Sequence, residues 1–143
     1  LSYASEKIPE NSLITFVLGD NFFGSNPLID FDLDNFSGAH LFVKEVSNPQ
    51  EFGVIEVSAD KVINIHEKPQ DYISSFAVVG LYIYEYKCFE YIKHLKPSER
   101  GELEITDLNK VFLSKKNLNY SILKSWWIDA GTEERIQNLK DLI

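Results

Sequence analysis

Two aspartates, Asp20 and Asp129, each follow a short apolar run that is typical of a buried strand. Leu18-Gly19 stands directly before Asp20, and Trp126-Trp127-Ile128 stands before Asp129. Open α/β sheets bind their ligands beyond the carboxyl ends of such strands. Two carboxylates facing one pocket suit Mg²⁺, which takes one or two protein carboxylates and fills its other positions with phosphate and water oxygens. Each aspartate alone is also compatible with an ordinary turn or a helix cap.

Three more charged residues could hold a phosphorylated sugar. In the run Glu67-Lys68-Pro69, the carboxylate could accept hydrogen bonds from sugar hydroxyls and the ammonium could neutralise a phosphate. Adjacent side chains of a strand point to opposite faces, so these two reach one pocket only if the strand twists where it ends. Arg100 precedes Gly101 at the start of an acidic helix and could clamp a phosphate. The simpler alternatives are a solvated surface pair and a capped helix with a surface arginine.

Strands that alternate with helices must position these residues, which is typical of the α/β class. Residues 53–57 and 62–66 flank a four-residue turn and predict a hairpin. The long apolar run 76–84 predicts a buried strand of a mixed sheet, and the apolar spacing within 103–113 predicts a helix. Further strands are expected over 15–18, 39–46 and 120–123, further helices over 1–9, over 85–95 and after a cap at Thr132, and a loop with one weak helix over 24–38.

The composition is that of a globular protein, for which we expect a single domain over residues 1–143. The chain is 44% hydrophobic and carries a net charge of −8, which argues against nucleic acid as a partner because that binding needs a basic surface. Cys88 is the one cysteine and lies in an apolar stretch, so we expect a core residue and no intrachain disulfide. No apolar run approaches the length of a membrane span. We therefore expect a soluble, cytoplasmic protein that binds no membrane.

Six blocks of the sequence, taken in order, resemble the sugar-1-phosphate nucleotidyltransferases, and most nearly the glucose-1-phosphate thymidylyltransferases among them. They are LGDNFF from Leu18, NPQEFGVIE from Asn48, EKP from Glu67, AVVGLYIY from Ala77, LKPSERGELEITDLN from Leu95 and WIDAGT from Trp127. The resemblance covers nearly the whole chain. It implies a Rossmann-like nucleotidyltransferase fold, in which helices flank a mixed sheet.

The resemblance also implies a reaction and the residues that serve it. A sugar 1-phosphate, with glucose 1-phosphate favoured, would attack the α-phosphorus of a nucleoside triphosphate, with dTTP favoured, and release pyrophosphate. Mg²⁺ would be the cofactor, and catalysis would rest on positioning and electrostatic stabilisation. By position, the catalytic residues are Asp20, Asp129 and Arg100, of which the two aspartates hold the metal. The substrate-binding residues are Phe52, Gly53, Glu67, Lys68 and Val78.

The sequence departs from the family pattern in two ways. Phe52 stands where the family often has tyrosine, and Val79 and Ala130 replace usual threonines, which weakens the case for one particular sugar. The family's Gly-rich loop, whose backbone grips the triphosphate, has no counterpart in these 143 residues.

We therefore expect the C-terminal, sugar-binding portion of such an enzyme, incomplete at the N-terminus and inactive alone. The strand before Asp20 would then keep an unpaired edge. That edge would pair with a separate N-terminal segment or with another copy of the chain in a homo-oligomer.

Three alternatives stay open. One is a non-catalytic domain that binds sugar phosphates or serves in assembly. Another is a uridylyl- or cytidylyltransferase for a related sugar 1-phosphate. The weakest is a metal-dependent phosphohydrolase that uses Asp20 as nucleophile, because that chemistry needs a second aspartate two residues later, where this chain has Phe22.

Overall fold

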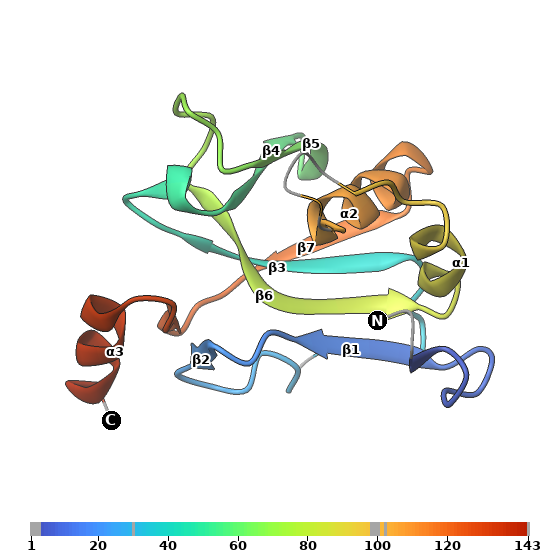
Figure 1. The fold of residues 1–143 in the computed structure, drawn as a ribbon, viewed down its shortest axis with the longest axis horizontal. Coiled ribbons are helices and arrows are strands. Elements are labelled where there is room, and N and C mark those ends of the chain that lie inside the picture. Colours follow the sequence, from blue (N-terminus) through green and yellow to red (C-terminus); the bar gives the residue numbers. More distant parts are fainter. Residues whose placement is uncertain (1–3, 30, 98–100, 102, 143) are drawn as a thin grey trace.

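A computed structural model describes residues 4–29, 31–97, 101 and 103–142, which form a mixed β-sheet flanked by helices (Figure 1). The strands are β1 (Leu13–Val17), β2 (Asn21–Phe23), β3 (Ala39–Glu45), β4 (Gly53–Ser58), β5 (Lys61–Glu67), β6 (Phe76–Glu85), β7 (Leu118–Ile122) and β8 (Trp127–Asp129). The helices are the 3₁₀ turn η2 (Pro49–Glu51), α1 (Cys88–Ile92), α2 (Ile105–Ser114) and α3 (Glu133–Lys140).

Strand β6 is the centre of the main sheet, whose order is β5-β4-β6-β3-β7 with β1 also paired to β6. Strand β3 follows one edge of β6, and the other edge is shared by β4, at Ala77, and by β1, from Leu81 to Glu85. The β3–β7 pair is parallel and the others are antiparallel. The sheet is therefore mixed, as the sequence predicted. Gly80 lies in the stretch of β6 between the residue that pairs with β4 and the residues that pair with β1.

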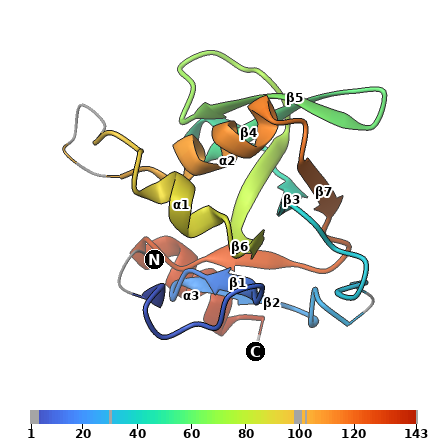
Figure 2. The same cartoon turned by 90° about the vertical axis from the view of Figure 1, so that its right-hand side faces the viewer.

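Helices α1 and α2 lie side by side over one face of this sheet and enclose the larger core (Figure 2). Tyr82 and Tyr84 contribute to it from β6, and Phe89 and Phe112 contribute from the two helices. Cys88 is buried in the same core, and burial raises the pKa of its thiol to about 12. The prediction that Cys88 is a core residue is confirmed.

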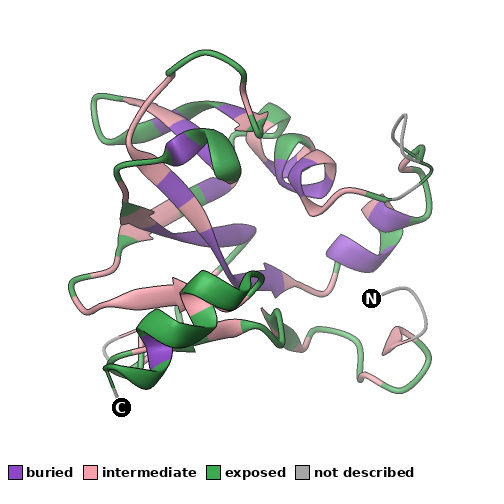
Figure 3. Cartoon of the chain, turned by 60° about the vertical axis from the view of Figure 1, so that its left-hand side comes forward, coloured by how far each residue is buried: buried purple, intermediate pink, exposed green. Residues whose placement is uncertain are grey.

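The opposite face of the sheet packs against the loop that joins β2 to β3. The smaller core there contains Phe42, Val79, Leu81 and Ile83, and side chains that include Phe23, Leu28, Phe31 and Phe36 pack on it. His40 lies beside Phe31 and Phe42, and burial lowers the pKa of its imidazole to about 4. Figure 3 shows that buried residues concentrate in β3 and β6, whereas α3 is largely exposed.

Most predicted elements are present within a few residues of their expected bounds. The β4–β5 hairpin turns at Ala59 and Asp60, which have φ of 46° and 57°, the left-handed pair that a two-residue hairpin turn requires. Helix α1 is shorter than the expected 85–95.

Three expectations about local structure are wrong. In place of the α-helix expected over 1–9, Ala4 lies in a 3₁₀ turn and residues 5–8 form turns and a bend, residues 1–3 lie outside the described residues, and the left-handed Asn11 (φ 68°) stands shortly before β1. The described part of the loop 24–38 contains no helix. Strand β1 is not a buried strand either, since Ile14 is its one buried residue.

Within the described residues, β1 pairs with β6 and with no second strand. Leu13 and Val17 on this strand are 36% and 49% exposed. The free edge that the sequence analysis anticipated is present, and pairing with another chain through it stays a prediction. None of the helices in the described part of the chain has the length and apolar character needed to cross a membrane.

Candidate active site

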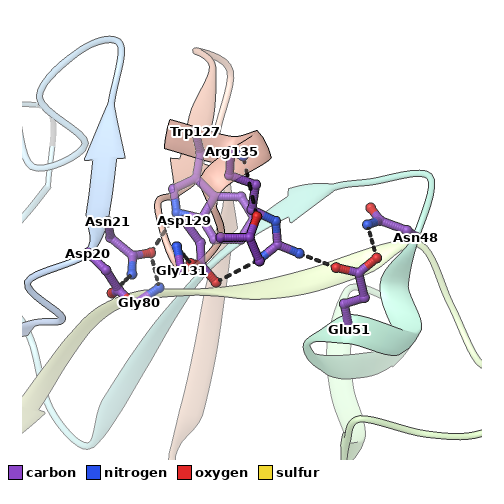
Figure 4. A network of polar contacts seen from close by, with 10 residues as sticks. Asp20, Asn21, Asn48, Glu51, Gly80, Trp127, Asp129, Gly131 and Arg135 are labelled. Carbon is purple, nitrogen blue, oxygen red and sulfur yellow. Dashed lines mark hydrogen bonds and ion pairs between the residues drawn. The ribbon is translucent and has the colours of Figure 1, made fainter. Parts of the chain in front are cut away.

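The two-stranded sheet β2–β8 brings Asp20 and Asp129 together, although they lie near opposite ends of the chain. Asn21 pairs with Asp129 and Phe23 pairs with Trp127 in antiparallel register. Just beyond the sheet, the backbone N–H of Ala130 donates to the carbonyl of Asp20 at 2.7 Å. Both aspartates lie at strand ends, as expected from the sequence, and this pairing makes those ends adjoin (Figure 4).

The side chain of Asn21 fastens this small sheet to β6. Its Oδ1 accepts hydrogen bonds from the N–H of Gly80 at 2.9 Å and from Nε1 of Trp127 at 2.6 Å. Its Nδ2 donates to Oδ1 of Asp20 at 2.7 Å. Glycine is required at position 80, because a Cβ there would stand 2.5–2.8 Å from the Asn21 amide. Asn21 thus fixes the orientation of the Asp20 carboxylate relative to β6 and β8.

Glu67 and Lys68 reach the site from the end of β5. Glu67 pairs with Gly53 across the hairpin, and its Oε2 accepts a hydrogen bond from the hydroxyl of Thr106 at 2.5 Å. Lys68 has a φ of 42°, a left-handed conformation that ends the alternation of the strand. Both side chains therefore line one cavity, which is the condition that the sequence analysis set for them.

That cavity has a volume of about 170 Å³. Every candidate site residue that the structure describes lines it: Asp20, Phe52, Gly53, Glu67, Lys68, Val78 and Asp129. Arg100 lies outside the described residues. A larger hollow of about 300 Å³ lies between the loop after β2 and residues 121–126, and none of these candidates lines it.

The carboxylate of Asp129 is engaged by two donors. Its Oδ1 accepts from the N–H of Gly131 at 2.7 Å, and its Oδ2 accepts from Nη1 of Arg135 at 3.3 Å. The other terminal nitrogen of Arg135 forms an ion pair with Glu51, and the guanidinium lies 4.9 Å from the centre of the Phe52 ring. Arg135 thus links Asp129, in β8, to the residues that precede β4.

Negative charge predominates around the cavity. Among the described residues that line it, four carry carboxylates (Asp20, Glu51, Glu67 and Asp129) and one, Lys68, carries an ammonium. Burial, and then the charges of Glu67 and Asp20, raise the pKa of the Tyr82 phenol well above its usual range. Tyr82, which also lines the cavity, therefore stays protonated, and Lys68 or a bound cation would offset the charge of the carboxylates when an anion enters.

The chemical type of the ligands available in the cavity suits Mg²⁺. Carboxylate oxygens from Asp20 and Asp129 are the hard ligands that this ion prefers, and Mg²⁺ usually completes its coordination with phosphates and water. In the described part of the chain, no group of three or more acidic, histidine or cysteine side chains gathers closely enough to hold an ion. A cation held by Asp20 and Asp129 would take its other ligands from water or from a bound phosphate.

Comparison with known proteins gives the family. A model of the nucleotidyl transferase family matches residues 2–142 of the sequence. The chain belongs to the nucleotidyl transferase family. The glucose-1-phosphate thymidylyltransferase of Neisseria meningitidis is 34% identical over 163 aligned positions, covering 100% of this chain and 57% of that protein. That of Xanthomonas campestris is 41% identical over 134 positions, covering 89% of this chain and 45% of the relative.

Solved structures agree with the fold of this nucleotidyl transferase chain. A Bacillus anthracis protein assigned as a glucose-1-phosphate thymidylyltransferase, solved with sucrose bound, matches 99% of the chain and 58% of its own length, with 38% identity and a TM-score of 0.89. A UDP-glucose pyrophosphorylase matches with 20% identity and a TM-score of 0.82, which supports the fold alone. The Rossmann-like nucleotidyltransferase fold is confirmed. The chain spans about half the length of these relatives, from 45% to 59%.

Four residues of the site were not singled out from the sequence. Asn21 and Thr106 stand in the sequence only within the blocks LGDNFF and LKPSERGELEITDLN, and Trp127 stands in the apolar run before Asp129. Arg135 carried no local signal, because one of its partners, Glu51, lies far away in sequence. The pairing of Asn-Phe-Phe with Trp-Ile-Asp had no local signal, because runs of three residues show no periodicity.

Proposed function

We propose that this nucleotidyl transferase chain binds a sugar 1-phosphate, with glucose 1-phosphate favoured, and provides the sugar-phosphate and Mg²⁺ side of a thymidylyl transfer. The observation that carries the proposal is the convergence of Asp20, Glu67, Lys68 and Asp129 on one cavity. The relatives named glucose-1-phosphate thymidylyltransferase, which align with the whole chain or nearly all of it, support the choice of sugar and base.

Each residue has a role that follows from its chemistry. Lys68 places a positive charge on the phosphate of the sugar 1-phosphate. Glu67, oriented by Thr106, accepts hydrogen bonds from the sugar hydroxyls, and Val78 and Phe52 form an apolar wall. Gly53 lets the sugar approach the backbone, because it has no side chain. Mg²⁺ at Asp20 and Asp129 would neutralise charge that develops on the phosphate oxygens.

The reaction is a substitution at phosphorus. A phosphate oxygen of the sugar 1-phosphate forms a bond to the α-phosphorus of dTTP while the bond to pyrophosphate breaks, and pyrophosphate leaves. The residues above hold the attacking oxygen in place, and such positioning supplies a large part of the rate enhancement in reactions of this type. The chain spans 57% of the N. meningitidis relative and holds no Gly-rich loop for the triphosphate, so we expect binding, and no transfer by this chain alone.

Calorimetric titration of the 143-residue chain with glucose 1-phosphate in the presence of Mg²⁺ tests the proposal. We expect binding that Asp20→Asn and Lys68→Gln each weaken about tenfold or more, the usual cost of removing one charged partner. Asp60→Asn and Lys61→Gln are matched controls, since both change exposed residues at the far end of the β4–β5 hairpin. Glucose 6-phosphate and inorganic phosphate should bind more weakly.

A pyrophosphate-release assay with dTTP, UTP and CTP separates the remaining alternatives. Release by the chain alone would overturn the expectation of inactivity and identify the base. Absence of any sugar-phosphate binding, or equal effects of Lys68→Gln and Lys61→Gln, would overturn the proposed site. Binding that never supports transfer, even with the corresponding N-terminal part of a relative added, would favour a non-catalytic sugar-phosphate-binding domain.

A further inference from the structure

We infer that Arg135 is a resident counter-cation of Asp129, which keeps the binding of a bare divalent cation weak and so makes the cation enter together with a phosphorylated ligand. This inference rests on the proposed function, because it takes Asp129 as a metal ligand. The inference goes beyond the proposed function in one respect: the cation binds strongly only when the phosphorylated ligand is present. The residue responsible, Arg135, is not among the site residues predicted from the sequence.

The contacts of Asp129 carry the first step. Both of its carboxylate oxygens already accept a hydrogen bond, one from the Gly131 N–H and one from Arg135. A cation at Asp129 must therefore use the remaining lone pairs or displace one of these donors. It also meets the positive charge of Arg135, whose Nη1 lies 3.3 Å from Oδ2 of the carboxylate.

Arg135 is held in place by more than Asp129. Glu51 forms an ion pair with it, and Nδ2 of Asn48 donates to the other oxygen of Glu51 at 2.6 Å (Figure 4). The Phe52 ring also lies against its guanidinium. The arginine side chain is 21% exposed. If a cation took over Asp129, these contacts would keep the guanidinium beside the site, and its repulsion of the cation would persist.

Arg135 exerts this charge without filling the sugar-phosphate cavity. Asp129, Phe52 and Trp127 line both that cavity and a smaller neighbouring hollow of about 150 Å³, and Arg135 lines the smaller one. The arginine thus approaches Asp129 from the neighbouring hollow and does not line the cavity that contains Lys68. A sugar phosphate entering there brings negative charge and extra oxygen ligands, which offset the repulsion and complete the coordination.

Mn²⁺ binding to the chain, followed by the electron paramagnetic resonance signal of the free ion at low ionic strength, tests the inference without any activity assay. We expect Arg135→Gln to bind bare Mn²⁺ about three- to tenfold more tightly than wild type, as removal of one partly screened positive charge predicts. Arg135→Lys retains the charge and should stay within about twofold. Lys140→Gln, on the same helix and exposed, is the matched control.

Glu51→Gln provides a test of opposite sign. It removes a negative charge beside Arg135 and should weaken bare Mn²⁺ binding, whereas a purely structural role of the Arg135 cluster would shift both variants in the same direction. Saturating glucose 1-phosphate should strengthen Mn²⁺ binding more in wild type than in Arg135→Gln. Thermal unfolding of each variant establishes that the compared proteins are folded.

The outcomes separate this inference from the proposed function. If Asp20→Asn and Asp129→Asn abolish Mn²⁺ binding while Arg135→Gln leaves it at the wild-type value, the counter-cation role is overturned and the metal site stands. If neither aspartate variant changes Mn²⁺ binding, the metal site in the proposed function is overturned. If Arg135→Gln and Arg135→Lys tighten binding equally, charge is not the cause and the inference is likewise overturned.

Discussion

Asn21 lies opposite Asp129 in the β2–β8 pair, and its side chain hydrogen-bonds the Asp20 carboxylate. Asn21 therefore sets the spacing between the two candidate metal ligands. Its backbone pairs with Asp129, and its side-chain amide hydrogen-bonds Asp20. The same amide binds Gly80 of β6 and Trp127 of β8. The geometry of the site thus depends on a residue that has no chemistry of its own in the proposed reaction.

Replacing Asn21 by alanine should destabilise the fold by about 1–3 kcal/mol, because the Gly80 N–H and the Trp127 indole would lose their acceptor in a partly buried place. Urea unfolding followed by tryptophan fluorescence measures this. Asn119→Ala replaces an exposed residue of β7, and its free energy of unfolding should stay within about 0.5 kcal/mol of wild type. Equal stabilities of the two variants would show that the Asn21 contacts contribute nothing.

Gly80→Ala should be destabilising by about 1–3 kcal/mol, since the added methyl group would overlap the Asn21 amide and force it away from Asp20. Gly19→Ala is the matched control, because a Cβ at that position meets nothing within 4 Å. Denaturation midpoints of the two variants give the comparison. A Gly80→Ala protein as stable as Gly19→Ala would contradict the close packing of β2 on β6.

Thr106→Val should weaken glucose 1-phosphate binding about three- to tenfold with a smaller effect on stability, because Glu67 would lose the hydroxyl that orients its carboxylate. The hydrogen bond concerned is 2.5 Å long, and Thr106 is 5% exposed. Thr106→Ser keeps the hydroxyl and should bind nearly as wild type. Calorimetric titration with glucose 1-phosphate measures the affinity of both variants. Equal affinities of Thr106→Val and Thr106→Ser would exclude the orienting role of the hydroxyl.

The buried imidazole of His40 should make the fold less stable in acid. Burial lowers its pKa in the folded state from 6.5 to about 4, so below pH 6.5 the unfolded chain binds a proton that the folded chain does not. Stability should therefore fall between pH 6.5 and 4, by up to about 3 kcal/mol from this residue. His40→Gln should lose this part of the pH dependence, measured by urea unfolding across that range.

The control for His40 is His94→Gln, which changes an exposed imidazole after α1. It should retain the wild-type slope of unfolding free energy against pH. If His40→Gln retains the same slope, the His40 imidazole is not responsible for the acid sensitivity.

Local sequence patterns predicted the long helices and strands better than the short ones. The apolar run of β6, the β4–β5 hairpin and the helix cap at Thr132, whose side chain accepts from the Arg135 N–H at 3.3 Å, were all expected. The three-residue strand β2 was not, because three residues show no periodicity. Its stability comes from its partner, β8, and from the Asn21 side chain.

Motifs and periodicity in the sequence were enough to indicate the family, the kinds of side chain available for phosphate and metal chemistry, and their places at the ends of strands. Three relationships became visible only in the folded chain: Asp20 and Asp129 adjoin, the left-handed Lys68 shares a cavity with Glu67, and Arg135 pairs with Asp129. The reason is physical. Residue type and periodicity are local properties, whereas these contacts join segments far apart in the chain, and packing of the whole sheet fixes them.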